Sequence, residues 1–308
     1  MESVPCNLCG SDDAESLFTR GDLSTGRDGT FTIVRCRKCG LQYLNPRPTQ
    51  ESILFYYPPS YPCYTVYDKE EISNPLRIWW RDYIINKYCR AVRRFKQSGR
   101  ILDVGCATGR FLNTMRNSGD WECHGVELNP EIAGEGAARY GFCIKSGTVF
   151  DVEYEPGFFD VVTLWDVIEH VQDPLRTLRH VTGLLKQDGL IALTTPVSDA
   201  LGGKLFGRYW VGYEIPRHFY FFSTASLETL VGHAGLNIIS RRVLQGSDFA
   251  FADNVKFLLR GIGSPGWLYE SANTILRSSP WRWFTAPAFK LLDLARLTTP
   301  HAVFCTRE

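Results

Sequence analysis

The stretch Ile101-Leu-Asp-Val-Gly105-Cys-Ala-Thr-Gly109-Arg-Phe111 decides the fold of this chain. Its apolar first half predicts a buried strand, and its two glycines predict a tight turn that leads into a helix. Asp103 lies near the end of the strand, where open α/β sheets bind their ligands. The glycine spacing is G-x-x-x-G and lacks the middle glycine that lets a pyrophosphate approach the backbone. The turn therefore favours a nucleoside ligand that has no pyrophosphate.

A second acidic residue is predicted at the end of the next strand. The run Trp121–Glu127 has strand character, and Asn129-Pro130 directly after it indicates a helix cap followed by a first-turn proline. Glu127 is therefore expected where the strand gives way to the helix. A carboxylate at that position can accept hydrogen bonds from both hydroxyls of a ribose. The alternative is a surface carboxylate on a loop.

Two more strands and a helix are predicted downstream. The segment Phe159–Val171 begins as an apolar strand buried on both faces and ends in the polar element Asp166-x-x-Glu169-His170. Asp173-Pro174 then begins a helix with apolar residues at helical spacing, which Gly189 ends. Leu190–Thr195 supplies the next strand. The polar element is therefore expected at the ligand-binding edge of the sheet.

Together these segments resemble the class I methyltransferases that use S-adenosylmethionine (SAM). The turn matches their first motif in the form D-x-G-x-x-x-G, and Phe159–Val171 matches their F-D-V-V…E-H-V region. The resemblance implies an α/β, Rossmann-like sheet of seven strands, the last of them antiparallel. It also implies a SAM site made by Asp103, Gly105, Cys106, Gly109, Glu127, Leu128, Thr148, Val149, Trp165 and Asp166.

The ten cysteines include two copies of a C-x-x-C-G knuckle. Their four thiolates are predicted to hold one structural Zn²⁺, with the ligands Cys6, Cys9, Cys36 and Cys39. The alternative is a pair of disulfides or redox dithiols, which the paired spacing and a reducing compartment disfavour. We assign residues 1–48 to a zinc ribbon. A ribbon followed by a methyltransferase core resembles bacterial sugar and natural-product methyltransferases.

Residues 49–98 connect the ribbon to the core at residues 99–308. The segment Tyr56–Tyr64 is rich in tyrosine and proline, unlike a flexible linker. It is expected to lie over the core, either with a tyrosine facing the substrate or only as packing. Residues 75–96 carry apolar residues at mostly helical spacing, and the resemblance assigns them to the helix that covers SAM.

His218 is the predicted general base. It lies in a loop after the fifth strand, just before Ser223, which is expected to cap a helix. Methyl transfer requires an acceptor that is positioned and often deprotonated, and histidine titrates near neutrality. The resembling sugar methyltransferases carry a histidine in an H-x-x-x-F-S context as general base. Arg217 stands where those enzymes have a glutamate. The alternative role for His218 is a hydrogen bond to the backbone of its loop.

His170 is the second catalytic candidate. The element Asp166-x-x-Glu169-His170 resembles a metal-binding segment of ubiquinone-pathway O-methyltransferases. These three residues are therefore a candidate site for a divalent ion that orients a hydroxyl acceptor. A structural or SAM-positioning role is the alternative, since the element is widespread in the superfamily.

The core is interrupted by a helical insertion at residues 244–300. Ile238–Val243 is predicted as the sixth strand and Ala302–Thr306 as the seventh, antiparallel strand. The insertion is rich in tryptophan and arginine. We expect a helical cap with its own apolar face. The alternative is a surface at residues 267–294 for a lipid-linked acceptor or for peripheral membrane contact.

Composition narrows the class of function. The 34 basic and 33 acidic residues give a net charge of +1, which provides no strong attraction to nucleic acid. The N-terminal residues have neither the charge nor the apolar run of a signal peptide, so we expect a cytoplasmic protein. The predicted function is methyl transfer from SAM to a small molecule such as a sugar, glycoconjugate or secondary metabolite. The alternatives are an RNA methyltransferase that clamps nucleic acid with its ribbon and a catalytically silent SAM-fold protein.

Overall fold

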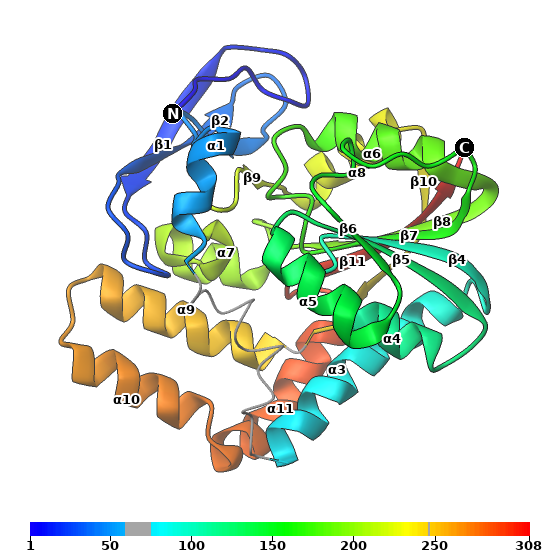
Figure 1. Cartoon of the computed structure of the whole chain (residues 1–308). Coiled ribbons are helices and arrows are strands. Elements are labelled where there is room, and N and C mark those ends of the chain that lie inside the picture. Colours follow the sequence, from blue (N-terminus) through cyan, green and yellow to red (C-terminus); the bar gives the residue numbers. More distant parts are fainter. Residues whose placement is uncertain (59–74, 246) are drawn as a thin grey trace.

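A seven-stranded sheet forms the centre of the computed structural model, which describes residues 1–58, 75–245 and 247–308 (Figure 1). Four neighbouring strand pairs in it are parallel, whereas β11 runs antiparallel to both β8 and β10. The predicted Rossmann-like sheet with an antiparallel last strand is therefore confirmed. In spatial order the strands are β10 (Leu236–Val243), β11 (His301–Arg307), β8 (Leu185–Thr195), β7 (Phe159–Trp165), β4 (Gly99–Val104), β5 (Trp121–Glu127) and β6 (Cys143–Ser146).

Alternate residues of the central strands enter two separate hydrophobic cores, one on each face of the sheet. Ile101 and Val161 belong to one core, and their chain neighbours Leu102 and Val162 belong to the other. All four side chains are fully buried. This is the reason for the continuous apolar runs that predicted these strands, because a parallel strand covered on both sides needs apolar residues at every position.

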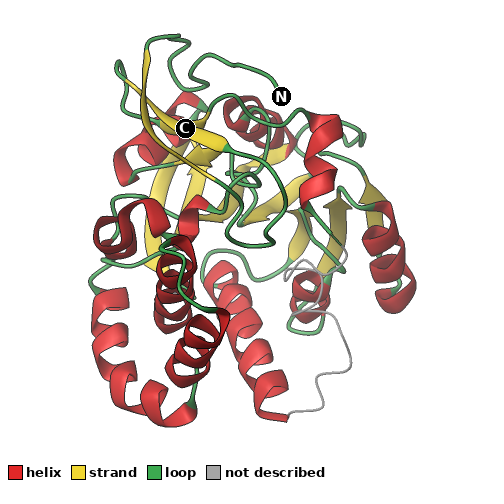
Figure 2. Ribbon diagram, turned by 90° about the vertical axis from the view of Figure 1, so that its left-hand side faces the viewer, coloured by secondary structure: helices red, strands yellow, loops and turns green. Residues whose placement is uncertain are grey.

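Helices cover both faces of the sheet (Figures 1 and 2). The predicted caps are present: the side chains of Asn129, Asp173 and Ser223 accept hydrogen bonds from backbone N–H groups in the first turns of α5, α6 and α8. One face carries α3 (Pro75–Arg93) and α4 (Arg110–Arg116), and the other carries α6 (Pro174–Leu184) and α8 (Thr224–His233). The remaining flanking helix is α5 (Pro130–Tyr140).

The N-terminal segment forms a second sheet that takes one strand from the core. Its strands are β1 (Ala14–Arg20), β2 (Phe31–Cys36), β3 (Gln42–Leu44) and β9 (Tyr220–Phe221). Tyr43 pairs with Tyr220, which lies in the loop after β8. The buried side chains of Ile33, Leu44 and Trp210 belong to one continuous core. The ribbon segment is therefore packed into the core domain and does not hang from it as a separate appendage.

Short helices and the C-terminal insertion complete the chain. The insertion folds as the predicted helical segment, with α9 (Ser247–Gly261), α10 (Gly266–Leu276) and α11 (Ser279–Leu294). No helix in the described ranges is both long and apolar enough to cross a bilayer. The shorter elements are α1 (Gln50–Ile53), η1 (Leu54–Tyr56), α7 (Leu201–Phe206), η2 (Gly207–Tyr209) and η3 (Val211–Tyr213).

Some predicted boundaries differ from the structure. The fifth strand begins at Leu185 and not at Leu190, because β8 continues through the position of Gly189 that was predicted to end the preceding helix. The sixth strand begins two residues earlier than predicted, at Leu236. The tyrosines at 61 and 64 of the aromatic connecting segment, and Cys63, lie outside the described residues.

The buried carboxyl of Asp103 makes stability depend on pH. Thr163 Oγ1 donates to Asp103 Oδ1 at 2.6 Å, but burial dominates and raises the pKa of Asp103 to about 7. In the unfolded chain the pKa is about 3.9. The folded protein therefore binds the extra proton between these values, and the contribution of Asp103 to stability falls as pH rises from about 4 to about 7.

We expect the variant Asp103→Asn, which cannot titrate, to lose less stability than the wild type between pH 5 and pH 8. The difference should be on the order of 2 kcal/mol in the free energy of unfolding, measured by urea titration at both pH values. Equal losses in the two proteins would show that Asp103 is not protonated in the folded chain at pH 5.

Candidate active site

A cavity of about 560 Å³ lies beside the ends of β4, β5 and β7, where the sequence places the ligand site. Its volume is in the range of small-molecule pockets. One part of its wall comes from the turn after β4 and from the ends of β5 and β7. Another part comes from α1, from α3 and from the segment after β7. The central sheet and the helices α1 and α3 therefore form the cavity wall together.

Gly105 shapes the turn at the cavity wall. Its φ is +71°, and a Cβ there would lie 2.6 Å from Val167 Cγ2, so both conformation and space require glycine. The N–H groups of Gly105 and Cys106 both donate to the carbonyl of Val126, at 2.8 and 3.1 Å. The turn is thereby fixed against the neighbouring strand β5.

Glu127 holds the same turn from the other side. Its two carboxylate oxygens accept hydrogen bonds from Ala107 N at 3.0 Å and from Asn129 N at 2.9 Å. Burial raises the pKa of the carboxyl, and the bonds from Asn129 and Ala107 oppose that rise. A carboxylate offers about four lone pairs, so both oxygens keep acceptor capacity toward the cavity that Glu127 lines. This arrangement suits a pair of ribose hydroxyls.

Most of the predicted cofactor residues share this wall. Those that line the cavity are Gly105, Cys106, Glu127, Leu128, Thr148, Val149, Trp165 and Asp166. Asp103 and Gly109 are not among the described residues that line it. Asp103 points into the protein interior and binds Thr163. Gly109 instead begins α4 with φ +81°, where a Cβ would lie 2.9 Å from both Phe142 and Ile144. Asp103 and Gly109 therefore flank the turn without lining the cavity.

Asp166 lies at the end of β7 in an unusual backbone conformation. Its φ is +53°, which is uncommon for a residue other than glycine, and its N–H donates to Thr194 Oγ1 at 2.8 Å. Asp166 is exposed and lines the cavity, and desolvation by the surrounding protein raises the pKa of its carboxyl to about 6. The neighbouring Trp165 ring packs edge-on against Tyr88 and Phe111.

His170 and Tyr57 meet on the other part of the wall. His170 Nδ1 lies 2.9 Å from the Tyr57 hydroxyl and 3.1 Å from the carbonyl oxygen of Arg217. With the hydrogen on Nδ1 the ring donates to the Arg217 carbonyl and Nε2 keeps a lone pair, whereas in the other tautomer Nδ1 accepts from the Tyr57 hydroxyl. Burial, followed by the nearby His218, lowers the pKa of His170 to about 3, so the ring is uncharged at neutral pH. The sequence indicated a tyrosine-rich segment over the core but did not single out Tyr57.

His218, the predicted base, is not among the described residues that line the cavity. Its side chain is buried, and Nδ1 donates to the carbonyl of Gly212 at 2.8 Å. Its ring packs edge-on against that of His170 with centroids 4.4 Å apart, and burial lowers its pKa to about 4. His218 is thus bonded to the backbone of its loop through Nδ1, as in the alternative, and its role as general base stays a prediction, while His170 is the histidine that lines the cavity.

The candidate metal ligands near the cavity also differ from the predicted set. Glu169, His170 and His218 can each offer one ligand atom within 4.8 Å of the others, whereas Asp166 is not part of this group. Neither carboxyl oxygen of Glu169 has a hydrogen-bond partner among the described residues. Burial, followed by the charge of Asp166, raises the pKa of Glu169 well above its usual range. The carboxyl therefore favours its neutral form.

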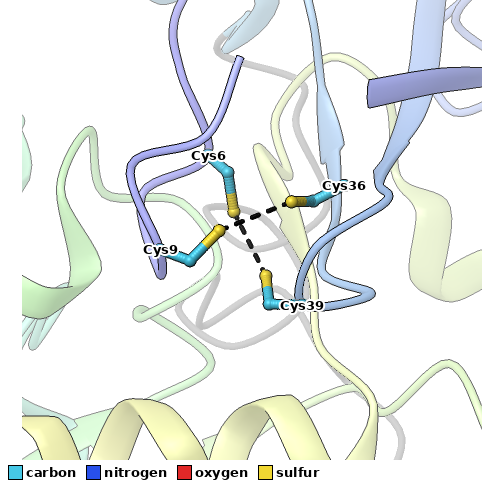
Figure 3. Close-up of side chains that lie close together, drawn as sticks. All are labelled: Cys6, Cys9, Cys36 and Cys39. Carbon is cyan, nitrogen blue, oxygen red and sulfur yellow. Dashed lines mark hydrogen bonds between the residues drawn. The ribbon is translucent and has the colours of Figure 1, made fainter. Parts of the chain in front are cut away.

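The four knuckle cysteines come together in the N-terminal sheet, with their sulfur atoms pointing toward one another (Figure 3). The Sγ atoms of Cys6 and Cys39 are 3.4 Å apart, and those of Cys9 and Cys36 are 3.5 Å apart. A disulfide requires an S–S distance of about 2.05 Å. A tetrahedral Zn²⁺ with Zn–S bonds of about 2.3 Å instead places the sulfur atoms roughly 3.8 Å apart. The geometry fits a four-thiolate metal site better than two disulfides.

The first knuckle contacts the cavity wall directly. Asn7, between Cys6 and Cys9, donates from its side chain to Asp173 Oδ1 at 2.8 Å and accepts from Leu175 N at 3.4 Å. Arg47, from the end of the ribbon segment, donates to the carbonyl of Gln172 at 2.7 Å. Gln172 and Asp173 both line the cavity. These hydrogen bonds from Asn7 and Arg47 therefore fix the start of α6 and the residues just before it.

The chain matches a family model described as a methyltransferase domain over residues 79–241, more than half of its length. A ubiquinone biosynthesis O-methyltransferase of Xanthomonas campestris is 32% identical over 155 residues, which cover 47% of this chain and 59% of that protein. One of Neisseria meningitidis is 33% identical over 133 residues, covering 40% of this chain and 50% of that protein. The chain thus spans only about half the length of these curated relatives.

Solved structures share the fold at low sequence identity. A 1,6-didemethyltoxoflavin-N1-methyltransferase of Burkholderia thailandensis, solved with S-adenosylhomocysteine, has a TM-score of 0.50 and 13% identity, covering 91% of this chain and 96% of that one. A protein of Galdieria sulphuraria described as a sarcosine dimethylglycine methyltransferase also has a TM-score of 0.50 and 13% identity, covering 77% and 90%. With the family match over more than half of its length, this chain belongs to the methyltransferase domain family and has the sheet of the class I SAM-dependent enzymes.

Proposed function

We propose that the protein transfers a methyl group from SAM to a hydroxyl of a small aromatic acceptor. The observation that carries this proposal is a single cavity that joins the Glu127-held turn to the His170–Tyr57 pair. A donor site and a proton-accepting histidine thus share one space. The ubiquinone O-methyltransferases that the chain resembles are named for transfer to oxygen, which supports the same choice.

In the proposed reaction SAM supplies the methyl group, and the chain supplies binding, alignment and proton removal. Bound SAM supplies an electrophilic methyl group on a good leaving group, so the chain has to hold the donor, align the acceptor and remove its proton. Glu127 holds the ribose through its two oxygens, and the Gly105 turn receives the rest of the nucleoside side of SAM. Nε2 of the uncharged His170 takes the acceptor proton, while Nδ1 stays bonded to the Arg217 carbonyl.

Two features favour a phenolic acceptor over a sugar. A histidine with a lowered pKa is a weak base, and it removes a proton more readily from a phenol, whose pKa is about 10, than from an alkyl hydroxyl. The cavity that His170 lines is also rich in apolar side chains, among them Ile53, Val171 and Phe219. An aromatic ring gains from burial against such a wall, whereas each sugar hydroxyl would need a hydrogen-bond partner.

A cation held by Glu169, His170 and His218 is the alternative way to activate the hydroxyl. The Nδ1 contacts leave Nε2 of both histidines open to a cation as well as to a proton, so we propose the base role for His170 and test the cation alternative by its metal dependence.

We further propose that the four cysteines hold a structural Zn²⁺. The four thiolates leave no open coordination position, so such an ion takes no part in methyl transfer. Its effect on the site passes through Asn7, which is bonded to Asp173 and Leu175 at the start of α6.

We expect Glu127→Gln to weaken SAM binding at least tenfold, because one acceptor oxygen becomes a donor toward the ribose. Isothermal titration calorimetry measures the change, with circular dichroism to verify the fold. The matched control is Glu122→Gln, an exposed position on the same strand, which should bind SAM normally. Unchanged affinity in Glu127→Gln would remove Glu127 from the SAM site.

We expect His170→Ala to lower kcat by about 10² to 10⁴ with a catechol-type phenol as acceptor, while SAM affinity is retained. His218→Ala should retain more activity, and His233→Ala, at an exposed position on α8, should be unaffected. Steady-state assays with labelled SAM measure these rates. A fully active His170→Ala would exclude the base role, and a wild type that needs added Mg²⁺ would favour the cation alternative.

We expect Asn7→Ala to raise the KM for the acceptor several-fold without changing SAM affinity or the content of one zinc per chain. The reason is that Asn7 holds Asp173 and Leu175 on the acceptor side, while the donor turn makes its contacts within the core. Elemental analysis gives the zinc content. Lys38→Ala, at an exposed position in the second knuckle, is the control. A purified protein without zinc, or equal KM values, would contradict this arrangement.

A further inference from the structure

The outer face of α11 is apolar and open to solvent. Trp283 is 87% exposed, Phe284 86%, Leu291 68% and Leu294 71%. With the exposed Pro287 these residues recur at the spacing of a single helix face, which we call the α11 face. The expected helical cap with its own apolar face is therefore present, and in α11 this face is open to solvent. Exposed apolar patches of this kind mark sites of contact with proteins or membranes.

The opposite side of α11 is already occupied by the protein. Phe289 packs against Phe251 of α9 with ring centroids 5.6 Å apart, and Arg282 forms an ion pair with Asp248 at 2.7 Å. The helix is thus fixed on its inner side, while none of the residues that the structure describes covers the α11 face. This orientation presents the two large aromatic side chains outward together.

The charges around the α11 face indicate which kind of partner it can bind. Lys290 at its edge and Arg296 just beyond the helix are both exposed. Three acidic residues of the insertion are already paired with cations: Asp248 with Arg282, Asp253 with Arg277 and Glu270 with Lys256. The fourth, Asp293, is only partly exposed and accepts a hydrogen bond from Thr298. The surface is therefore apolar with a positive margin.

This combination of charge and side chains fits an anionic bilayer better than a second copy of the chain. In a symmetric pair of copies joined through the α11 face, the positive margin would have to meet the same surface of the second copy, where α11 offers Asp293 as its one acidic residue. An anionic lipid surface instead attracts the cations of this margin, and tryptophan and phenylalanine are suited to the interfacial region of a bilayer. We propose that α11 docks the protein onto the surface of an anionic phospholipid membrane.

The docking surface lies one helix away from the cavity. Lys87 of α3 is subject to the charges of Asp293 and Lys290 of α11, which places the two helices side by side (Figure 1). Ile84, Ile85 and Tyr88 of the same α3 line the cavity. Docking through α11 would therefore hold the cavity wall near the membrane. The docking itself does not depend on methyl transfer.

The test is flotation of the full chain with vesicles of phosphatidylcholine alone or with a third of phosphatidylglycerol. We expect binding to the anionic vesicles, weaker binding to the neutral ones, and loss of binding as salt increases. The double variant Trp283→Ser/Phe284→Ser should bind the anionic vesicles at least tenfold more weakly. Leu205→Ser, which is 65% exposed on α7, should bind like the wild type. SAM binding by the double variant verifies that it is folded.

Three results would overturn the proposal. The first is a wild type that does not float with anionic vesicles at low salt. The second is a folded double variant that floats as well as the wild type. The third is light scattering that shows a wild-type dimer and a monomeric double variant without vesicle binding, which would assign the α11 face to a second copy.

Discussion

The carboxylate of Glu127 is the interaction on which the donor side of the site depends. It joins Ala107 N, in the turn after β4, to Asn129 N, at the start of α5, through its two oxygens. The turn cannot move away from β5 without breaking one of these bonds, and the bonds from Gly105 N and Cys106 N to Val126 act in the same direction. Bonds within the chain therefore hold this part of the cavity wall in place, which lowers the cost of ordering it on binding.

The acceptor side depends on contacts between segments far apart in the chain. Arg217 is fully buried and binds both oxygens of Asp22, at 2.7 and 3.0 Å, while its carbonyl meets His170. Losing one partner of such a pair costs about 3 to 5 kcal/mol. Arg217 was the departure from the sugar methyltransferase pattern, and its reason is now physical: it ties the loop of His170 to the N-terminal segment. Residues 1–48 thus support the cavity from outside its lining, which begins at Gln50 among the described residues.

Local signals in the sequence predicted the structural elements around the Gly105 turn well. The turn at Gly105, the caps at Asn129 and Asp173 and the doubly buried strands follow from nearest-neighbour chemistry, and the structure confirms these elements. The sequence left open whether His218 bonds to the backbone of its loop and which histidine lines the cavity, because both depend on how two loops pack. The same holds for the pairing of β9 with β3 and for the outward face of α11, which are set by tertiary contacts.

The most direct measurement of the central claim is the fate of the methyl group of labelled SAM. The protein is incubated with an equimolar mixture of catechol-type phenols, hexoses and RNA, and the labelled products are identified by mass spectrometry. Our account predicts label on a phenolic oxygen as an aryl methyl ether. Label confined to RNA or to a sugar would contradict the assignment of the acceptor, and the absence of any labelled product with a protein that binds SAM would contradict the proposed methyl transfer to these acceptors.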